Sequence, residues 1–386
     1  MYQTLAVLAL AAVAADATPE APKAWEKLTE TKYAHGFLFA QDGYTAGIGA
    51  EIVKGTEQNR AQSFTYTLYR YKLGDKEPRI LDRRVSTGWL MGDLGPGGAV
   101  VTGWFANADT IHLPDHKPLP LPKDKVRWAA KRLTAEGLLC YGELYADNKY
   151  HHEIVLFPIT RRLGELGDAK VLRRWFAHGA DGFTLDFGHG NLHSRGEKLV
   201  YDGQVPNAAR PGFPDRGIEV WDVRNEKVLW REANASVEAA DDTHAYWTRG
   251  SDVIARRALD GKTKAEQFAL PKGTQRIELH PPFVLAFVAK DKTDDAAVFD
   301  LRTGERREFG LSRSRAAQQS PSGDHYMRQS AWFVPLPGGN PKGPFVSFRM
   351  DPATGEMRAA YNSALYKVPP TSREVPKDKP KWEPVS

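Results

Sequence analysis

The stretch AAVFDLRTGERREF, residues 296–309, has the pattern of a single β-hairpin. A short apolar run containing Val298 and Phe299 leads into the polar letters RTGE, and a second short run ends at Phe309. Gly304 lies in the polar letters and can adopt the positive φ that many tight turns require. Two short strands joined by such a turn are typical of an antiparallel sheet.

Six further segments repeat this order of apolar strand, polar turn and second strand. All seven read TYTLYRYKLGDKEPRIL, ADTIHLPDHKPLPLP, EIVLFPITRRLGELGDAKVLRRW, IEVWDVRNEKVLW, DVIARRALDGKTKAEQF, AAVFDLRTGERREF and FVSFRMDPATGEMRAAY. Their turns recur about every 47 residues, which is typical of propeller blades built from four strands. The sequence therefore predicts an all-β fold, a single β-propeller of seven four-stranded blades, with six or eight blades also compatible. Each hairpin would form the outer half of a blade.

Apolar strands precede several of these hairpins and would form the inner halves of the blades. They are visible in GLLCYGELY, EKLVYDGQV, THAYWTRG and PFVLAFVAKD. The phrases SPSGDHY (residues 320–326) and VWDVRNEKV (residues 220–228) resemble the turn and hairpin of WD40-like and TolB-like propeller repeats. This resemblance implies the propeller architecture and assigns no functional residue. The recurring tryptophans are expected to pack between blades.

Composition excludes several classes of protein. The chain has 386 residues, 41% hydrophobic and 26% charged, which is ordinary for a soluble globular domain. The net charge of +5 is spread among interleaved acids and bases, so no arm of the nucleic-acid-binding type is expected. The single cysteine, Cys140, excludes an intramolecular disulfide framework, and its apolar context predicts a buried, inert thiol.

The two ends of the chain differ from the repeats. Residues 1–17 combine a short apolar run with two A-x-A patterns and are predicted to be a signal peptide, which implies a secreted or periplasmic protein. The apolar run is too short to span a membrane. Residues 18–32 are predicted to be a linker, residues 33–368 the propeller, and residues 369–386 a disordered tail rich in Pro and Lys.

One segment concentrates side chains that could bind a ligand. It runs from Phe176 to Gly196 and provides the candidate ligand-binding residues His178, Asp181, Asp186, His189, His193 and Arg195. Its glycines disfavour the helix on which His189 and His193 would share a face, so no metal and no cofactor are expected. The Pro- and Gly-rich stretch Tyr201–Gly217 reads as a long inserted loop. With only Lys198–Tyr201 as a strand between them, the two segments would emerge at opposite ends of that strand unless the insertion folds back.

The function stays open between binding and catalysis. No nucleophile elbow, phosphate-binding loop or dinucleotide fingerprint occurs in the sequence. Acidic residues are plentiful, and Asp241-Asp242 precede a predicted inner strand, where loops can approach the propeller axis. The first hypothesis is an exported propeller that binds a protein or carbohydrate partner without catalysis. The alternatives are a hydrolase or lyase acting on glycans and, more remotely, a structural subunit of an envelope complex.

Overall fold

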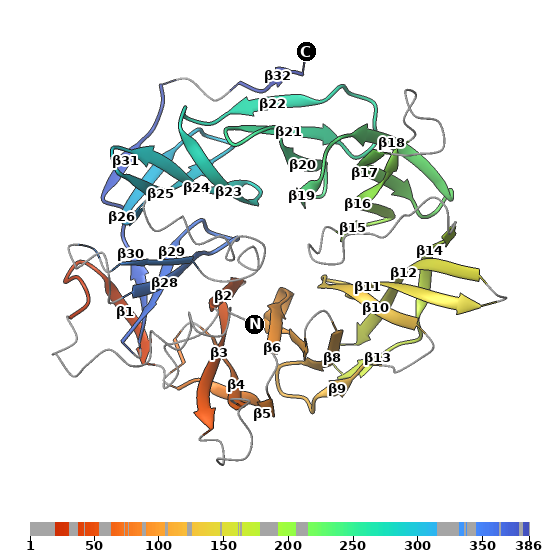
Figure 1. The fold of residues 1–386 in the computed structure, drawn as a ribbon, viewed down its shortest axis with the longest axis horizontal. Coiled ribbons are helices and arrows are strands. Elements are labelled where there is room, and N and C mark those ends of the chain that lie inside the picture. Colours follow the sequence, from red (N-terminus) through yellow and green to blue (C-terminus); the bar gives the residue numbers. More distant parts are fainter. Residues whose placement is uncertain are drawn as a thin grey trace.

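The computed structural model is a ring of seven β-sheets arranged around a central axis (Figure 1). The seven-bladed, all-β prediction is therefore confirmed. Within the described part of the chain, helical structure is limited to the 3-10 turn η1 (Pro96–Gly98), and no helix could span a membrane. The structure describes residues 20–30, 38–41, 43–53, 63–72, 74–75, 77–86, 90–104, 107–121, 126–146, 149–160, 162, 164–177, 192–205, 215–314, 332–335, 337, 345–362, 364–377 and 381–385.

Each blade is built from strands that are consecutive in the sequence and antiparallel. Blade 1 comprises β2 (Leu38–Gln41), β3 (Tyr44–Val53), β4 (Ser63–Lys72) and β5 (Arg79–Ser86). Blade 2 comprises β6 (Leu90–Leu94), β7 (Val100–Trp104), β8 (Asn107–His112) and β9 (Leu119–Pro120). Blade 3 comprises β10 (Val126–Leu133), β11 (Gly137–Ala146), β12 (Lys149–Thr160) and β14 (Lys170–Ala177), with the short β13 (Glu165–Leu166) also pairing with β12.

The remaining blades follow the same plan. Blade 4 comprises β15 (Leu192–Arg195), β16 (Lys198–Val205), β17 (Asp215–Asp222) and β18 (Lys227–Ala233). Blade 5 comprises β19 (Val237–Ala240), β20 (His244–Thr248), β21 (Val253–Ala258) and β22 (Glu266–Ala269). Blade 6 comprises β23 (Thr274–His280), β24 (Phe283–Lys290), β25 (Thr293–Asp300) and β26 (Arg306–Ser314). Blade 7 comprises β27 (Trp332–Pro335), β28 (Phe345–Met350), β29 (Met357–Tyr361) and β30 (Ala364–Val368).

The hairpin that identifies the fold is the outer pair of blade 6, β25 and β26. Gly304 has a φ of 74° and donates its N–H to the carbonyl of Asp300 at 2.7 Å, which closes the turn. The Asp300 carboxylate accepts a hydrogen bond from the Arg302 N–H at 2.9 Å, and this side-chain-to-backbone bond stabilises the turn. Six of the seven predicted hairpins are outer pairs of this kind. The seventh, β28 and β29, is followed outward by β30, so its predicted outer position is wrong.

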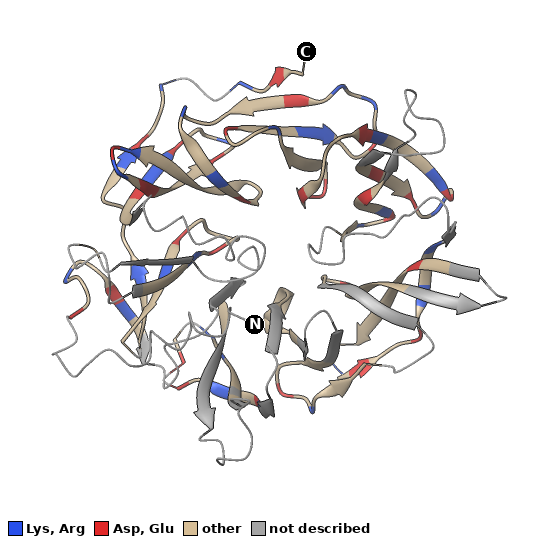
Figure 2. Ribbon diagram, viewed as in Figure 1, with Lys and Arg blue, Asp and Glu red and all other residues tan. Residues whose placement is uncertain are grey.

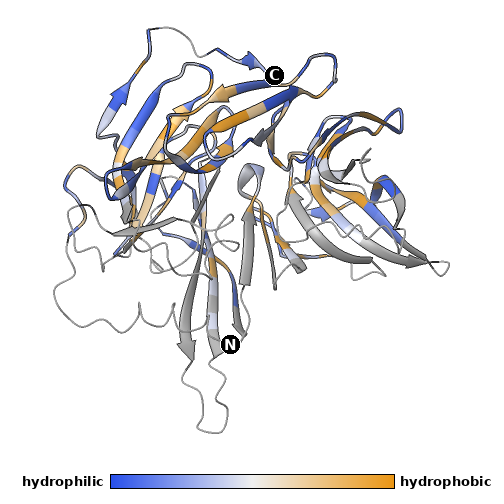
Figure 3. Ribbon diagram, turned by 45° about the horizontal axis from the view of Figure 1, so that its top comes forward, coloured by the Kyte–Doolittle hydropathy of each residue, from blue (hydrophilic) through white to orange (hydrophobic). Residues whose placement is uncertain are grey.

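Among the described residues the hydrophobic core lies between the blades, and β11, β16, β20 and β24 each contribute to two interfaces. On β24, Phe283, Leu285 and Phe287 pack toward blade 7, whereas Val284, Ala286 and Val288 pack toward blade 5. Both faces of the strand are buried, which explains why its sequence is apolar without alternation. Figure 3 shows the hydrophobic residues along the strands and the hydrophilic ones at turns and outer edges. Trp247 and Cys140 are both buried in such interfaces, as predicted.

Buried polar contacts also join neighbouring blades. Arg358 on β29 donates to Asp351 and to Thr45 Oγ1 of blade 1, the latter at 3.1 Å, and thereby links the last blade to the first. Asp202 on β16 accepts hydrogen bonds from Ser236 Oγ at 2.7 Å and the Val237 N–H at 2.8 Å, which attaches blade 4 to blade 5. Burial of these groups is tolerated because each has a partner.

Glu219 makes the corresponding connection between blades 3 and 4. The buried carboxylate on β17 accepts hydrogen bonds from Arg173 of β14, from the Tyr201 hydroxyl and from Arg231. The Arg173 guanidinium also lies 4.1 Å from the Trp221 ring centroid. Glu219 thus binds Arg173 across the interface while Tyr201 and Arg231 of its own blade hold the carboxylate in place.

Both ends of the described chain form strands where the sequence predicts a linker (residues 18–32) and a disordered tail (residues 369–386). β1 (Glu26–Glu30) pairs with β30 on the outer edge of blade 7. β31 (Ser372–Glu374) pairs with β26 on blade 6, and β32 (Glu383–Pro384) pairs with β22 on blade 5 (Figure 1). These segments lack an apolar pattern because they lie at the rim and satisfy the backbone groups of edge strands. We call residues 371–377 and 381–385 the C-terminal strap.

Candidate functional site

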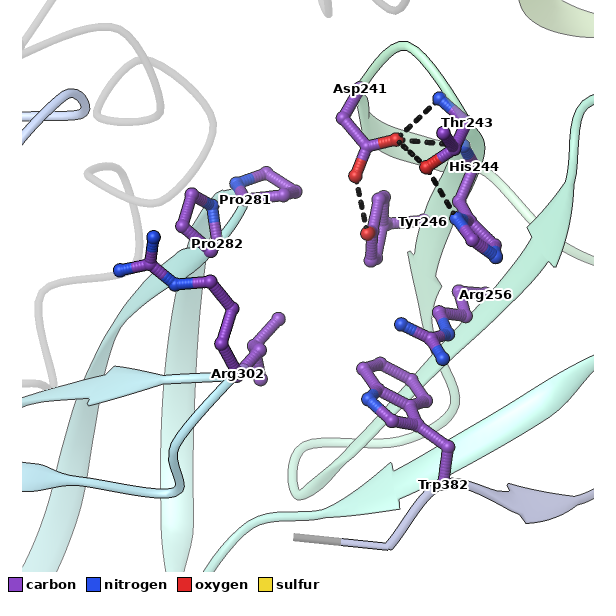
Figure 4. A pocket seen from close by; sticks show the side chains of 10 residues that line it. Asp241, Thr243, His244, Tyr246, Arg256, Pro281, Pro282, Arg302 and Trp382 are labelled. Atoms are coloured by element: carbon purple, nitrogen blue, oxygen red, sulfur yellow. Dashed lines mark hydrogen bonds between the residues drawn. The ribbon is translucent and has the colours of Figure 1, made fainter. Parts of the chain in front are cut away.

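A pocket with a volume of about 550 Å³ lies between blades 5 and 6 (Figure 4). Blade 5 supplies Asp241, Thr243 and His244 from the turn between β19 and β20, together with Tyr246 and Arg256 from the strands behind it. Blade 6 supplies Pro281, Pro282, Leu301 and Arg302 from two turns, and the C-terminal strap supplies Trp382. We call the end of the ring that carries these turns the pocket face.

Asp241 organises the blade 5 wall through one tight turn. Its Oδ1 accepts hydrogen bonds from the N–H of Thr243, the N–H of His244 and the Thr243 hydroxyl, each at 2.7 Å. Its Oδ2 accepts a hydrogen bond from the Tyr246 hydroxyl at 2.6 Å. Burial alone would raise the pKa of Asp241, but the hydrogen bonds from Tyr246, Thr243 and His244 outweigh it and lower the pKa below its usual value. The carboxylate is therefore a fixed acceptor rather than a proton donor.

Tyr246 and His244 are held beside this carboxylate in their uncharged forms. Burial raises the pKa of Tyr246 well above its usual value, and the hydrogen bond to Asp241 raises it further. Burial lowers the pKa of His244, and the nearby charge of Arg256 lowers it again. His244 Nδ1 lies 2.7 Å from the Thr243 hydroxyl. Near neutral pH the wall thus presents a carboxylate, a phenol and a neutral imidazole.

Arg256 and Trp382 form the lower part of the same wall as drawn in Figure 4. The Arg256 guanidinium lies 3.9 Å from the Trp382 ring centroid, and its Nε donates to Glu266 Oε2 at 2.9 Å. Trp382 also packs against Phe268, with ring centroids 5.6 Å apart, and meets the Tyr246 ring edge-on at 6.4 Å. The cation is therefore positioned by an acid on one side and an aromatic face on the other.

The opposite wall is mainly apolar. Pro281 and Pro282, joined by a cis peptide bond, lie above the aliphatic part of Arg302 in Figure 4, and Leu301 also lines this wall. The Arg302 guanidinium points away from the blade 5 wall and forms a two-pronged ion pair with Asp300, at 2.7 and 3.0 Å. Burial acts to raise the pKa of Asp300, but the hydrogen bonds from Arg302 lower it below its usual value. This cation is engaged on its own turn and contributes its stem to the pocket.

The sequence-predicted site is only partly described. His178, Asp181, Asp186 and His189 lie outside the described residues. His193 is buried within β15, and no group of three or more His, Cys, Asp or Glu able to hold a metal ion occurs among the described residues. The predicted ligand site and the expected lack of a metal stay predictions.

Arg195 is the predicted residue that the structure brings beside the pocket. Its Nη2 and Nε donate to the carbonyl oxygen of Ala240 at 2.7 and 3.1 Å, directly before Asp241. Its Nε also lies 3.9 Å from Asp242, whose side chain is almost fully exposed. Arg195 thus fixes the start of the turn that carries the Asp241 carboxylate, from the neighbouring blade.

The described parts of the predicted long loop Tyr201–Gly217 are strand, and residues 206–214 lie outside the described residues. β16 continues to Val205 and β17 begins at Asp215, with Val205 paired to Asp215. Residues 192–195 also form a strand, β15, so the chain enters β15 and leaves β16 at the same end of blade 4. The expectation of opposite ends is wrong because the histidine-bearing segment itself contributes an inner strand. That end lies opposite the pocket face.

Sequence reasoning identified Asp241-Asp242 as acids before an inner strand but missed the partners of Asp241. Tyr246 lies on β20 and Arg256 on β21, and the sequences of these strands contain no motif that marks them as part of a site. Trp382 lies in the segment interpreted as a disordered tail. The available signal was the single tryptophan in that polar tail, because an isolated large aromatic in such a segment often marks a docking point.

Solved structures are similar to this chain at low sequence identity. No family model and no curated protein matches the sequence. The propeller domain of the Trilobed protease from Pyrococcus furiosus is 11% identical with a TM-score of 0.44, over 89% of this chain and 98% of that one. Pyrococcus horikoshii acylaminoacyl peptidase is 12% identical with a TM-score of 0.47, over 87% of this chain and 52% of that one. TolB from Acinetobacter baumannii is 11% identical with a TM-score of 0.30, over 88% and 83%.

Proposed function

We propose that this protein is a non-catalytic binding propeller whose pocket between blades 5 and 6 binds a carbohydrate. The observation that carries the proposal is the line of polar groups on the blade 5 wall. Asp241 is an acceptor, the Tyr246 hydroxyl donates to Asp241 and can accept a further hydrogen bond, and Arg256 is a donor. Tyr246 and Arg256 lie against the indole of Trp382. Neighbouring hydroxyl groups of a sugar present the same alternation of donors and acceptors, and their carbon skeleton can pack on apolar side chains.

The two guanidiniums of the pocket are compensated by acids and do not favour an anionic ligand. Arg256 is paired with Glu266, and Arg302 is paired with Asp300, so neither guanidinium presents an uncompensated charge. Figure 2 shows Lys and Arg interleaved with Asp and Glu along the described parts of the ring. A binding mode based on hydrogen bonds and packing fits this arrangement better than the capture of a strongly charged partner.

Glycan cleavage, the alternative function, has weaker support at this pocket. A glycosidase uses two carboxyl groups, one of which has a raised pKa and donates a proton. Asp241 is the one carboxyl group among the described lining residues, and its pKa is lowered. Its four hydrogen bonds hold it as a carboxylate. Binding without proton transfer is the chemistry that this geometry favours.

The test is a glycan array screened with the full chain, followed by titration calorimetry with the oligosaccharide that binds best. Tyr246→Phe removes one hydroxyl and keeps the ring, so we expect affinity to fall roughly 3- to 10-fold, the effect of one net hydrogen bond. Tyr366→Phe is the matched control, because Tyr366 lies on blade 7 against Trp25 and should leave affinity unchanged. Lack of binding to any glycan, or equal affinities of the two variants, would contradict the proposal.

We further propose that the protein acts outside the cytoplasm. The support is the sequence of residues 1–17, where a short apolar run precedes two A-x-A patterns. In the native host, mass spectrometry of the N-terminus is expected to find a mature chain beginning between residues 15 and 18. A cytoplasmic pool that retains Met1 would refute export and leave the binding proposal intact, since that proposal is argued from residues of blades 5 and 6 and Trp382.

A further inference from the structure

The C-terminal strap occupies the outer edges of two blades through very short pairings. β31 pairs three of its residues with Arg306, Arg307 and Glu308 of β26, and Arg373 forms an ion pair with Glu305. β32 pairs two residues with Glu266 and Gln267 of β22, and the Val385 N–H donates to the Ala265 carbonyl at 2.9 Å. The strap therefore docks as an extended peptide added to existing sheet edges.

Trp382 is the anchor of the blade 5 portion. Its indole contacts Arg256, Phe268 and Tyr246 and packs against the hydrophobic cluster between blades 5 and 6. The neighbouring strap residues are mostly exposed, including Val375, which has 65% of its surface in solvent. A single aromatic side chain in a fitted recess, flanked by backbone pairing, is the usual composition of a peptide-docking site.

The geometry also allows this portion to leave and return without disturbing the propeller. Trp382 to Val385 lie at the end of the described chain on the outside of the ring, so no segment has to thread through another (Figure 1). Seven residues separate Glu374 from Trp382, and if extended they reach roughly 23–25 Å. The blade 6 portion can thus stay docked while the blade 5 portion reaches beyond its own molecule.

We propose that the blade 5 edge and its tryptophan recess are an interaction surface for a second copy of this chain, which docks its own strap there in exchange. The occupant is defined by the structure, because residues 381–385 of another copy would make the same backbone bonds and the same aromatic contacts as in the closed monomer. Exchange of identical elements is a low-cost route to a dimer. The recess shares Trp382, Tyr246 and Arg256 with the carbohydrate pocket, but the test below uses no carbohydrate, so its failure is distinguishable from failure of the carbohydrate proposal.

The experiment measures docking in trans on the full chain. A fluorescently labelled peptide of residues 369–386 is titrated with full-length Trp382→Ala protein, whose own strap has lost its anchor. We expect saturable binding to this acceptor and at least tenfold weaker binding to the wild type, whose attached strap competes at a high effective concentration. A peptide carrying Trp382→Ala should bind at least tenfold more weakly, whereas a peptide carrying Lys381→Ala, the matched control at an exposed position, should bind normally.

Exchange between copies is read out by light scattering after size-exclusion chromatography. Wild-type protein incubated at high concentration in mild urea and returned to buffer should contain a dimer that is missing from Trp382→Ala. The proposal would be overturned if the peptide shows no saturable binding to a folded acceptor, or if the wild-type and Trp382→Ala peptides bind equally well. It would also be overturned if the dimer fraction is the same in wild-type and Trp382→Ala protein. Should Trp382→Ala fail to fold, Val385→Pro serves as acceptor, because it removes the N–H bonded to Ala265 without touching the core.

Discussion

Replacing Arg358 with alanine is expected to lower the free energy of unfolding by about 3–5 kcal/mol, the effect of removing one partner from a buried ion pair. Arg358 and Asp351 are both almost completely buried, and Arg358 also donates to Thr45 across the interface that closes the ring. Without the guanidinium, the Asp351 carboxylate keeps the Ala353 N–H at 2.9 Å but loses its cation in a site from which water is excluded. Urea unfolding followed by circular dichroism measures the change.

Two further variants separate the buried charge from lost packing. Arg358→Met combined with Asp351→Asn removes both charges and should recover part of the stability, because no uncompensated ion remains. Arg79→Ala breaks an exposed ion pair with Asp115, 3.1 Å in length, and should change stability by roughly 0–1 kcal/mol. A loss from Arg358→Ala no larger than that from Arg79→Ala would mean that the pair does not support ring closure.

Glu219→Ala is expected to have a comparable effect, about 3–5 kcal/mol, at the interface of blades 3 and 4. The carboxylate compensates two guanidiniums, of which that of Arg173 is largely buried against Trp221. Burial lowers the pKa of Arg173 while Glu219 raises it, so removal of the acid leaves a desolvated cation without its main compensation. The measurement is the shift of the urea midpoint, together with the slope of the transition as a check on compactness.

Tyr201→Phe provides the comparison within the same cluster. It removes one hydrogen-bond donor to Glu219 and keeps the ring that packs beneath Arg173, so a loss of about 0.5–1.5 kcal/mol is expected. Glu219→Gln, which keeps the shape and an acceptor but not the charge, should fall between the two. If Glu219→Ala and Tyr201→Phe destabilise equally, the charge of Glu219 is not what holds blades 3 and 4 together.

The propeller could be predicted because its strands repeat and because turn chemistry is local. The turn after Asp300 is determined by Gly304 and by the Asp300 side chain, both of which are visible in fourteen letters. The apolar runs of β11, β16, β20 and β24 follow from burial on both faces between blades. The rim strands β31 and β32 were missed because both of their faces are solvated, so their sequences carry no apolar pattern. They are stabilised by pairing with the edge strands β26 and β22, which are distant in the sequence.

The candidate pocket was less predictable because it depends on the arrangement of blades rather than on a motif. Asp241 was noticed as an acid in a turn, but its role depends on Tyr246 across the hairpin and on Arg256 one strand further out. Trp382 lines the same wall, although it lies more than a hundred residues after Arg256 in the sequence. The concentration of histidines, aspartates and an arginine in the sequence favoured the segment His178–Arg195 instead. Of the candidate residues in that segment, Arg195 contacts the turn of Asp241 by donating to the carbonyl of Ala240.

The sequential order of the strands within every blade has a consequence for how the chain reaches its fold. Each four-stranded sheet can form from residues that leave the ribosome together, which keeps the contact order of the individual blades low. The contact between Arg358 and Thr45 spans 313 residues and cannot form until blade 7 has been synthesised. Completion of the ring is therefore a late step with a large loop-closure entropy, as is the pairing of β1 with β30, and until the ring closes the two terminal blades each expose an unpaired hydrophobic face to chaperones or to aggregation.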